Sequence, residues 1–373
     1  MSEVLGTGEE VVDLFDRTLS DEEMEDLIEP DEVPPEVTYS TTDYPVDGLV
    51  KRLGQGSMRI AQFGVENPAN QTAGFQRGFV WTKGQMDRFV ESLLLGYPVP
   101  GIFLVKQTDN VLLVLDGQQR LETLRRFYDG IHNGRVFALD SAAGQFQGRT
   151  YKSLDESSRR ALDDSFMPAT IVSTDGSSAV NDAIYKIFER LNAGGTQLTP
   201  HEIRVALYAG SLMVVIEELN SGPSWRALFG PPNKRIRDHE LVMRVIALYL
   251  RADKYSRPLK TFLNDFSSEF RFANQLPDDA ARLFTRAADL LLRDVGSGAL
   301  RRNEGGQVNA AQAEAVMVGL MRRLATGDAP SGLTTAVDRL KEDETFARAT
   351  TRATADNEAV NDRLQLATQA FAK

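Results

Sequence analysis

The segment that most constrains the fold of this chain is residues 111–127. Its first five residues, Val-Leu-Leu-Val-Leu, form an apolar run typical of a buried strand, and Asp116 and Gly117 end that run. Apolar residues then recur at helical spacing, at Leu121, Leu124 and Phe127. Because glycine allows a tight turn, the segment predicts a strand, a turn and a helix in direct succession.

The start of this helix is suited to an anion. The first N–H groups of a helix have no partner within it, and the helix dipole favours negative charge there. Gln118, Gln119 and Arg120 occupy the first turn, which predicts a phosphate-handling site. Two other roles stay open for Asp116. Its carboxylate could cap the helix, with Gln119 at the third helical position, or it could hold a metal ion or a water. A Walker-type run, Gly-x-x-x-x-Gly-Lys-Ser/Thr, is absent, which disfavours an ordinary P-loop enzyme.

Hydrophobic periodicity predicts the neighbouring elements. A helix with one apolar face begins at Lys83 and ends near Gly96. Residues 102–106 and 111–115 form a predicted hairpin, and residues 167–173 a further strand. An amphipathic helix follows around Ile184–Leu191, and Gly194-Gly195 ends it.

The remainder of the chain is predicted to be mostly helical. Thr199 and Pro200 begin a helix, with Glu202 completing a capping box. Later helices are expected around residues 240–251, 280–292 and 310–324, whereas residues 328–373 are weakly patterned. We therefore expect an α+β protein, with a mixed α/β core followed by a mostly helical region.

The acidity of the chain is concentrated in its first residues. The net charge is -11, and residues 1–36 hold 14 acidic residues and one basic residue, which leaves about +2 for the rest. We expect residues 1–45 to be a disordered, solubilising arm. Alternatively, the arm mimics nucleic-acid phosphates and covers a basic groove. A domain at 46–200 and a helical domain at 201–373 complete the expected organisation.

The composition also restricts the class of protein. The sequence contains no cysteine, so disulfides and thiolate chemistry are excluded, and a cytoplasmic location is expected. No run of about 18 apolar residues is present, so no membrane association is expected.

Several motifs, in this order, resemble a known family. They are Phe-Gln-Arg-Gly-Phe-Val-Trp at 75–81, a segment at 91–100, Asp-Gly-Gln-Gln-Arg at 116–120, and a segment at 188–202. The chain resembles the domain of unknown function 262 family, the N-terminal module of GmrSD-type and SspE-type anti-phage proteins, over roughly residues 45–265. That family belongs to the ParB/sulfiredoxin-like superfamily.

The resemblance implies both a fold and an activity. It implies a ParB-like core, binding and hydrolysis of a nucleoside triphosphate, with Mg²⁺ as a possible cofactor, and a role in restricting foreign DNA. Asp116, Gln118, Gln119 and Arg120 would carry the chemistry. Further nucleotide contacts are expected from the flanking motifs, at Gln76, Arg77, Gly117, Arg190, Asn192, Gly195 and Thr196.

Two departures from the family pattern keep other functions open. Ala73 stands where relatives usually carry proline, and Glu122 adds a negative charge beside the turn. These departures favour a non-catalytic DNA-binding or adaptor protein as an alternative. A ParB-like DNA nickase is a further alternative.

The histidines bear on whether this chain cuts DNA. Relatives often append a His-Asn-His nuclease, but the last histidine here is His239. A separate nuclease subunit is therefore a candidate partner, and a homo-oligomer is also possible. His201 and His239 are expected to be surface residues.

A basic segment at residues 225–260 is the candidate nucleic-acid surface. It holds nine Lys or Arg residues against three acids, with aromatic residues among them. DNA contacts are expected at Lys234, Arg235, Arg237, Arg244, Arg251 and Lys254. The alternative interpretation is an ordinary solvated helix face.

Overall fold

The protein is described by a computed structural model. The structure describes residues 37–60, 81–107, 109–142, 144–175, 177–191, 199–233, 235–272, 276–303, 306–327 and 329–372. These residues divide into two compact units. The sheet unit holds the described residues from 37 to 191, and the helical unit holds those from 199 to 372.

A five-stranded mixed sheet organises the sheet unit. Its strand order is β1-β7-β3-β4-β2, with antiparallel pairs β1/β7 and β3/β4 and parallel pairs β7/β3 and β4/β2. The strands are β1 (Tyr39–Pro45), β2 (Met58–Ile60), β3 (Ile102–Lys106), β4 (Leu112–Asp116) and β7 (Phe166–Ser173). The predicted hairpin and the predicted strand at 167–173 are confirmed.

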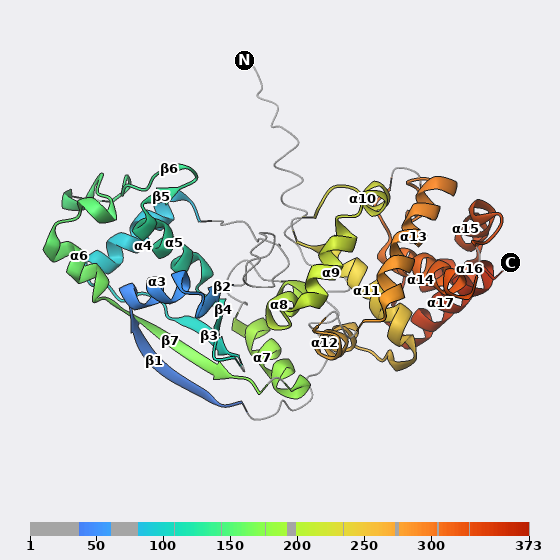
Figure 1. The fold of residues 1–373 in the computed structure, drawn as a ribbon, viewed down its shortest axis with the longest axis horizontal. Coiled ribbons are helices and arrows are strands. Elements are labelled where there is room, and N and C mark those ends of the chain that lie inside the picture. Colours follow the sequence, from blue (N-terminus) through green and yellow to red (C-terminus); the bar gives the residue numbers. More distant parts are fainter. Residues whose placement is uncertain are drawn as a thin grey trace, which may run out of the picture. The chain divides into compact units, whose positions relative to one another are not determined.

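Helices pack with one face of this sheet to form the core (Figure 1). They are α3 (Val46–Gly54), α4 (Lys83–Leu94), α5 (Gln118–Asp129) and α6 (Glu156–Asp163). The predicted apolar face of α4 is buried, and so are Leu121, Leu124 and Phe127 of α5. A capping box at Thr82 and Gln85 fixes the start of α4.

Smaller elements complete the sheet unit. A short hairpin joins β5 (Ile131–His132) to β6 (Arg135–Val136), and two 3₁₀ turns follow at Gly144–Phe146 and Tyr151–Ser153. Helix α7 (Ser178–Leu191) confirms the amphipathic helix that was expected there.

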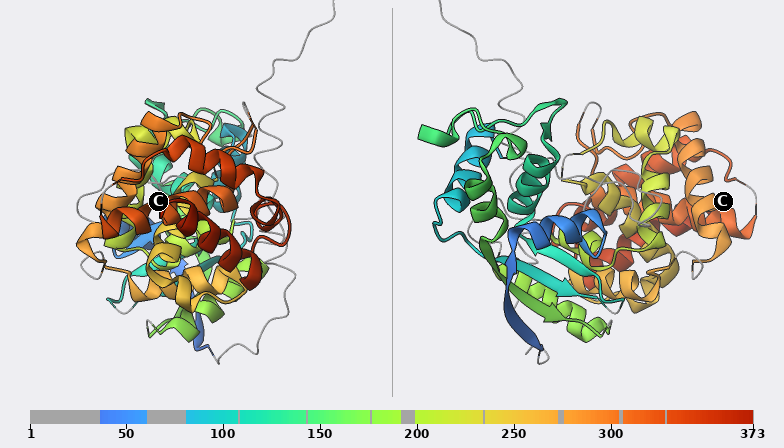
Figure 2. Two further views of the ribbon diagram at one scale, coloured as in Figure 1. Left: turned by 90° about the vertical axis from the view of Figure 1, so that its right-hand side faces the viewer. Right: turned by 60° about the vertical axis from the view of Figure 1, so that its left-hand side comes forward.

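The helical unit contains ten α-helices among its described residues (Figure 2). They are α8 (Pro200–Leu207), α9 (Ser211–Asn220), α10 (Pro223–Phe229), α11 (Arg237–Arg251), α12 (Leu259–Glu269), α13 (Asp278–Asp294), α14 (Ala310–Thr326), α15 (Leu333–Glu342), α16 (Glu344–Ala349) and α17 (Asn357–Ala370). Helices α11 and α14 are buried along most of their length and form its centre. The expected fold class, a mixed α/β region followed by a mostly helical one, is confirmed.

Two regions differ from expectation. Residues 39–45, which we assigned to the acidic arm, form β1, because seven consecutive residues pair with β7. Residues 328–373 were weakly patterned in sequence, yet they contain α15, α16 and α17. Small residues explain this: α17 lies so close to α14 that a Cβ on Gly319 would come 2.8 Å from the backbone of Ala367. Close packing of Ala and Gly needs few large apolar residues, so it leaves a faint periodic signal.

Candidate nucleotide site at the start of helix α5

Gly117 forms the turn between β4 and α5. Its φ of 92° lies in the left-handed region, where residues with a Cβ are strained. A Cβ at this position would also approach the Ile102 Cγ2 to 2.4 Å. Both conditions require glycine here, and they hold the strand end and the helix start close together.

The start of α5 has no capping side chain of its own. Gly117 is the N-cap residue, and a glycine has no side chain that could accept a hydrogen bond from the first turn. The expectation that Asp116 caps the helix is wrong, because the left-handed glycine separates Asp116 from the first helical position. The N-cap residue therefore places no side-chain oxygen or carboxylate at the positive end of the helix dipole.

Asp116 instead forms an ion pair with Arg120. The Oδ2 of Asp116 lies 2.8 Å from the Nη2 of Arg120, and the same Nη2 donates to the Gly101 carbonyl at 2.9 Å. The Arg120 side chain is 14% exposed, whereas that of Asp116 is 55% exposed. Water can solvate the half-exposed Asp116 carboxylate when it leaves Arg120, whereas the largely buried guanidinium needs another anion in its place.

The two glutamines of the turn have different contacts. The Gln119 Oε1 accepts a hydrogen bond from the Trp81 backbone N–H at 3.2 Å, which connects the end of the first motif to α5. The Gln118 side-chain amide lies 3.5 Å from the Val114 carbonyl, a distance at the weak limit of hydrogen bonding. Gln119 therefore has a positioning contact, and Gln118 is held only weakly.

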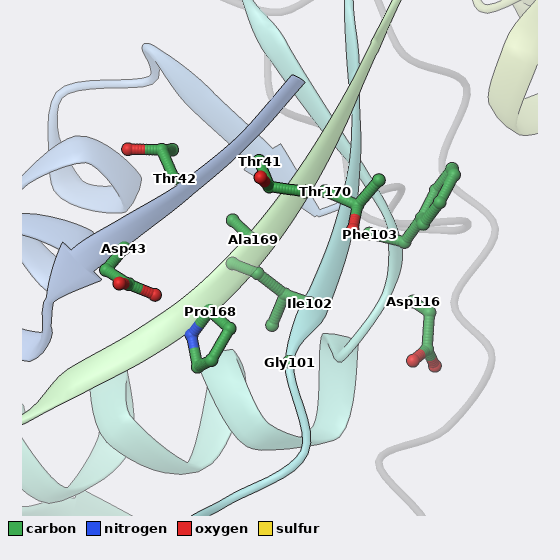
Figure 3. Close-up of a pocket in the computed structure, with 10 residues that line it drawn as sticks. All are labelled: Thr41, Thr42, Asp43, Gly101, Ile102, Phe103, Asp116, Pro168, Ala169 and Thr170. Atoms are coloured by element: carbon green, nitrogen blue, oxygen red, sulfur yellow. The ribbon is translucent and has the colours of Figure 1, made fainter. Parts of the chain in front are cut away.

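A pocket of about 350 Å³ adjoins the turn within the sheet unit. It is lined by strand residues and by the end of β4: Thr41, Thr42, Asp43, Gly101, Ile102, Phe103, Asp116, Pro168, Ala169 and Thr170. Figure 3 shows the carboxylates of Asp43 and Asp116 at opposite ends of this lining. The sequence alone did not reveal the pocket, because its lining comes from four strands, and β1 and β7 lie far from β3 and β4 in the chain.

A comparison with protein families identifies this region. Residues 62–209 match the family model described as the GmrSD restriction endonuclease, N-terminal domain. This part of the chain is similar to that domain, and we call residues 62–209 the GmrSD-type domain. The match confirms the family resemblance and contains the turn at 116–120. No curated protein and no solved structure matches the chain.

Glu122 of the GmrSD-type domain is neutralised by its neighbours. Its carboxylate receives hydrogen bonds of 2.7–2.9 Å from Arg125 and Arg126. Burial would raise the pKa of Glu122, but these hydrogen bonds and the two positive charges lower it below its ordinary value. The negative charge that Glu122 adds beside the turn is therefore paired with two guanidinium groups.

Most of the other expected nucleotide contacts lie in segments that the structure does not describe. Gln76, Arg77, Asn192, Gly195 and Thr196 lie outside the described residues, as does Ala73. Arg190 is exposed in the last turn of α7.

The basic segment that follows the GmrSD-type domain engages carboxylates of the protein itself. Arg244 is 7% exposed and lies 3.4 Å from Glu314 and 3.5 Å from Glu240. Arg235 is also buried, 3.5 Å from Glu202. A buried, paired guanidinium is not presented to a DNA phosphate.

The basic residues at the ends of α11 are more accessible. Arg251 and Lys254 both lie near Glu269, at 2.6 and 3.6 Å, and the Lys254 side chain is 60% exposed. Arg237 is half-buried at the start of α11, and Lys234 lies outside the described residues. Among the described residues, Lys254 is thus the most exposed of the expected DNA contacts.

The surface position expected for two histidines is wrong. His201 and His239 are buried, and their Nε2 and Nδ1 atoms lie 2.8 Å apart. The Nη1 of Arg204 contacts the other ring nitrogen of His201 at 3.0 Å. Burial lowers the pKa of His239 to about 4 and that of His201 well below its ordinary value. Both rings are therefore neutral at pH 7.

The described residues contain neither a membrane-spanning helix nor a cluster of metal-binding side chains. None of their helices is long and apolar enough to cross a membrane. They contain no group of three or more His, Asp or Glu side chains arranged to hold a metal ion.

Proposed function

We propose that the GmrSD-type domain binds a nucleoside triphosphate at the start of α5 and hydrolyses it, as the nucleotide-handling part of a restriction system. The observation that carries this proposal is the Asp116–Arg120 pair at a helix start whose N-cap is a glycine, beside a pocket of about 350 Å³. Uncapped N–H groups and the helix dipole favour a phosphate at this position.

The ion pair gives the site a chemical basis. An incoming phosphate competes with the Asp116 carboxylate for the guanidinium of Arg120, because both are anions of similar hydrogen-bonding geometry. Arg120 then stabilises charge on the phosphoryl group, which is the main task in phosphoryl transfer. Asp116, released from Arg120, orients the attacking water, and Gln118 is free to contact the phosphate.

The residues present also fit a magnesium ion carried by the nucleotide. Mg²⁺ in such sites keeps several waters and takes only one or two protein carboxylates besides the phosphates. Asp116 is exposed enough to serve as that ligand, and a bound ion would supply charge neutralisation.

Hydrolysis by matched variants tests the proposal. Arg120→Ala and Asp116→Ala should each lower hydrolysis of ATP or GTP about 10²-fold or more, since each removes one polar group from the reacting phosphate. Arg160→Ala is the control, because it removes a surface pair of the same spacing, with Glu156 on α6. Equal rates in all four proteins, or no hydrolysis by wild type, would reject the proposal.

DNA remains the proposed partner of the system, with cleavage in a separate subunit. We propose a separate subunit because His201 and His239 contact each other in the core of the helical unit, where they cannot serve a nuclease site. Plasmid nicking by the purified chain with Mg²⁺ would contradict this division. A salt titration of DNA binding by wild type and Lys254→Ala tests whether DNA is the partner. An affinity that does not change with salt would reject DNA binding through this surface.

A further inference from the structure

Strand β1 exposes one edge of the sheet. It pairs with β7 through all seven residues, from Tyr39 with Val172 to Pro45 with Phe166, and its register contains no shift. Among the described strands none pairs with its other edge, and β1 is the outermost strand in Figures 1 and 2. Residues 39–43 are all exposed.

The hydrogen bonds to β7 determine which residues offer backbone groups on the free edge. The Ser173 N–H donates to the Thr38 carbonyl at 3.0 Å, and the Val46 N–H donates to the Ser165 carbonyl at 2.9 Å. Because bonded and non-bonded residues alternate in an antiparallel pair, even-numbered residues of β1 face β7. Tyr39, Thr41 and Asp43 therefore direct their N–H and C=O groups outward.

Among the described residues, this edge has little of the usual protection against pairing. Exposed edge strands are commonly blocked by charged side chains, above all lysines, by bulges or by an internal proline. Here the strand Tyr-Ser-Thr-Thr-Asp-Tyr-Pro contains no lysine, its one charged residue is Asp43, and its proline is the last residue. Its β-branched threonines also favour an extended conformation.

We propose that two copies of this chain pair through β1, antiparallel and centred on Thr41. In this register Thr41 faces Thr41 of the partner subunit, and Tyr39 faces Asp43 of the partner subunit. Every outward residue then finds a hydrogen-bonding partner in a two-fold symmetric ladder. The two aspartates do not face each other, so the pairing places no like charges opposite, although each chain has a net charge of -11.

The same register would extend the pocket. Thr41 and Asp43 line it, and a residue directly opposite Asp43 lies on the same face of the joined sheet. Tyr39 of the partner subunit would thus border the Asp43 end of the pocket. The dimer would therefore complete the wall of a site that one subunit leaves open.

Cysteine cross-linking tests this register, because the chain has no cysteine of its own. Thr41→Cys should form a disulfide-linked dimer on mild oxidation, since facing residues have Cα atoms about 5.5 Å apart, within disulfide range. Asp43→Cys alone should not cross-link, because the two copies of residue 43 would lie roughly 13 Å apart. Mixing tagged Tyr39→Cys with Asp43→Cys should restore the link. Equal cross-linking by Thr41→Cys and Asp43→Cys would overturn the register.

Sedimentation velocity tests the dimer without oxidation. The sedimentation coefficient of wild type should correspond to twice the monomer mass. Thr41→Lys should sediment as a monomer, because two lysines would face each other in the dimer. Ser40→Lys is the control, since residue 40 faces Thr42 of the partner subunit in the proposed register. A wild type that stays monomeric at all concentrations would overturn the proposal, and the edge would then await a strand from another protein.

Discussion

Arginine and carboxylate groups meet in both units of this protein, under opposite conditions. In the sheet unit, Asp116 and Arg120 pair beside a pocket, and the carboxylate is 55% exposed. In the helical unit, Glu314 lies 2.5 Å from Arg363 and 3.4 Å from Arg244, and all three side chains are at most 8% exposed. In the half-exposed pair, an anionic ligand can replace Asp116, because water solvates the carboxylate that leaves, whereas the buried group cannot be opened without leaving charge unsolvated.

The largest expected effect comes from breaking the buried group. Glu314→Gln should lower the free energy of unfolding of the helical unit by about 3–5 kcal/mol, because the guanidinium of Arg363 would stay buried without its carboxylate and Arg244 would keep only Glu240. Denaturant unfolding followed by circular dichroism measures this. Asp116→Asn is the matched exposed variant, with an expected change below about 1 kcal/mol. Equal losses in both variants would contradict the comparison.

The buried histidine pair should make the helical unit sensitive to acid. Because folding holds the pKa of His239 at about 4, the unfolded chain takes up protons first as the pH falls below about 6.5. Stability is therefore complete above pH 6.5 and is lost toward pH 4, by about 3 kcal/mol from His239 alone. His239→Gln should flatten the unfolding curve measured between pH 7 and pH 4. An unchanged slope would show that other groups carry the acid sensitivity.

The turn at Gly117 should be more sensitive to a methyl group than a second glycine of the same helix. Gly117→Ala combines a left-handed φ with a Cβ 2.4 Å from Ile102, and should cost about 3 kcal/mol. Gly130 ends α5 with a φ of 76° but has open space around it, so Gly130→Ala should cost only about 1 kcal/mol. Thermal unfolding of the two variants separates close contact from backbone strain. Equal losses of stability in the two variants would show that the contact with Ile102 does not add to the backbone strain.

The sequence predicted the parts of the fold that depend on local periodicity. The β3–β4 hairpin, the helix starts at Lys83 and Thr199, and the helix after Gly117 all follow from residues close together in the chain. The pocket did not, because β1 and β7 meet β3 only through long-range pairing. Because Tyr39–Pro45 was assigned to an acidic arm, three of the ten lining residues, Thr41, Thr42 and Asp43, were missed.

The roles of individual charged residues were the least predictable. Arg244 and His201 were expected at the surface because arginine and histidine side chains are seldom fully buried unless they are paired. Their burial depends on carboxylates and rings from distant helices, such as Glu314 on α14 and His239 on α11. The Asp116 cap failed for a local reason, since the left-handed Gly117 took the N-cap position.

Nucleotide binding without Mg²⁺ tests the central claim most directly, because it isolates the exchange of Arg120 between Asp116 and a phosphate. Isothermal titration of a nucleoside triphosphate into wild type, Asp116→Asn and Arg120→Ala would measure it. The neutral amide no longer competes for Arg120, so Asp116→Asn should bind severalfold more tightly than wild type, whereas Arg120→Ala should lose binding about tenfold or more. Weaker binding by Asp116→Asn, or unchanged binding by Arg120→Ala, would contradict the claim that this ion pair yields to a phosphate.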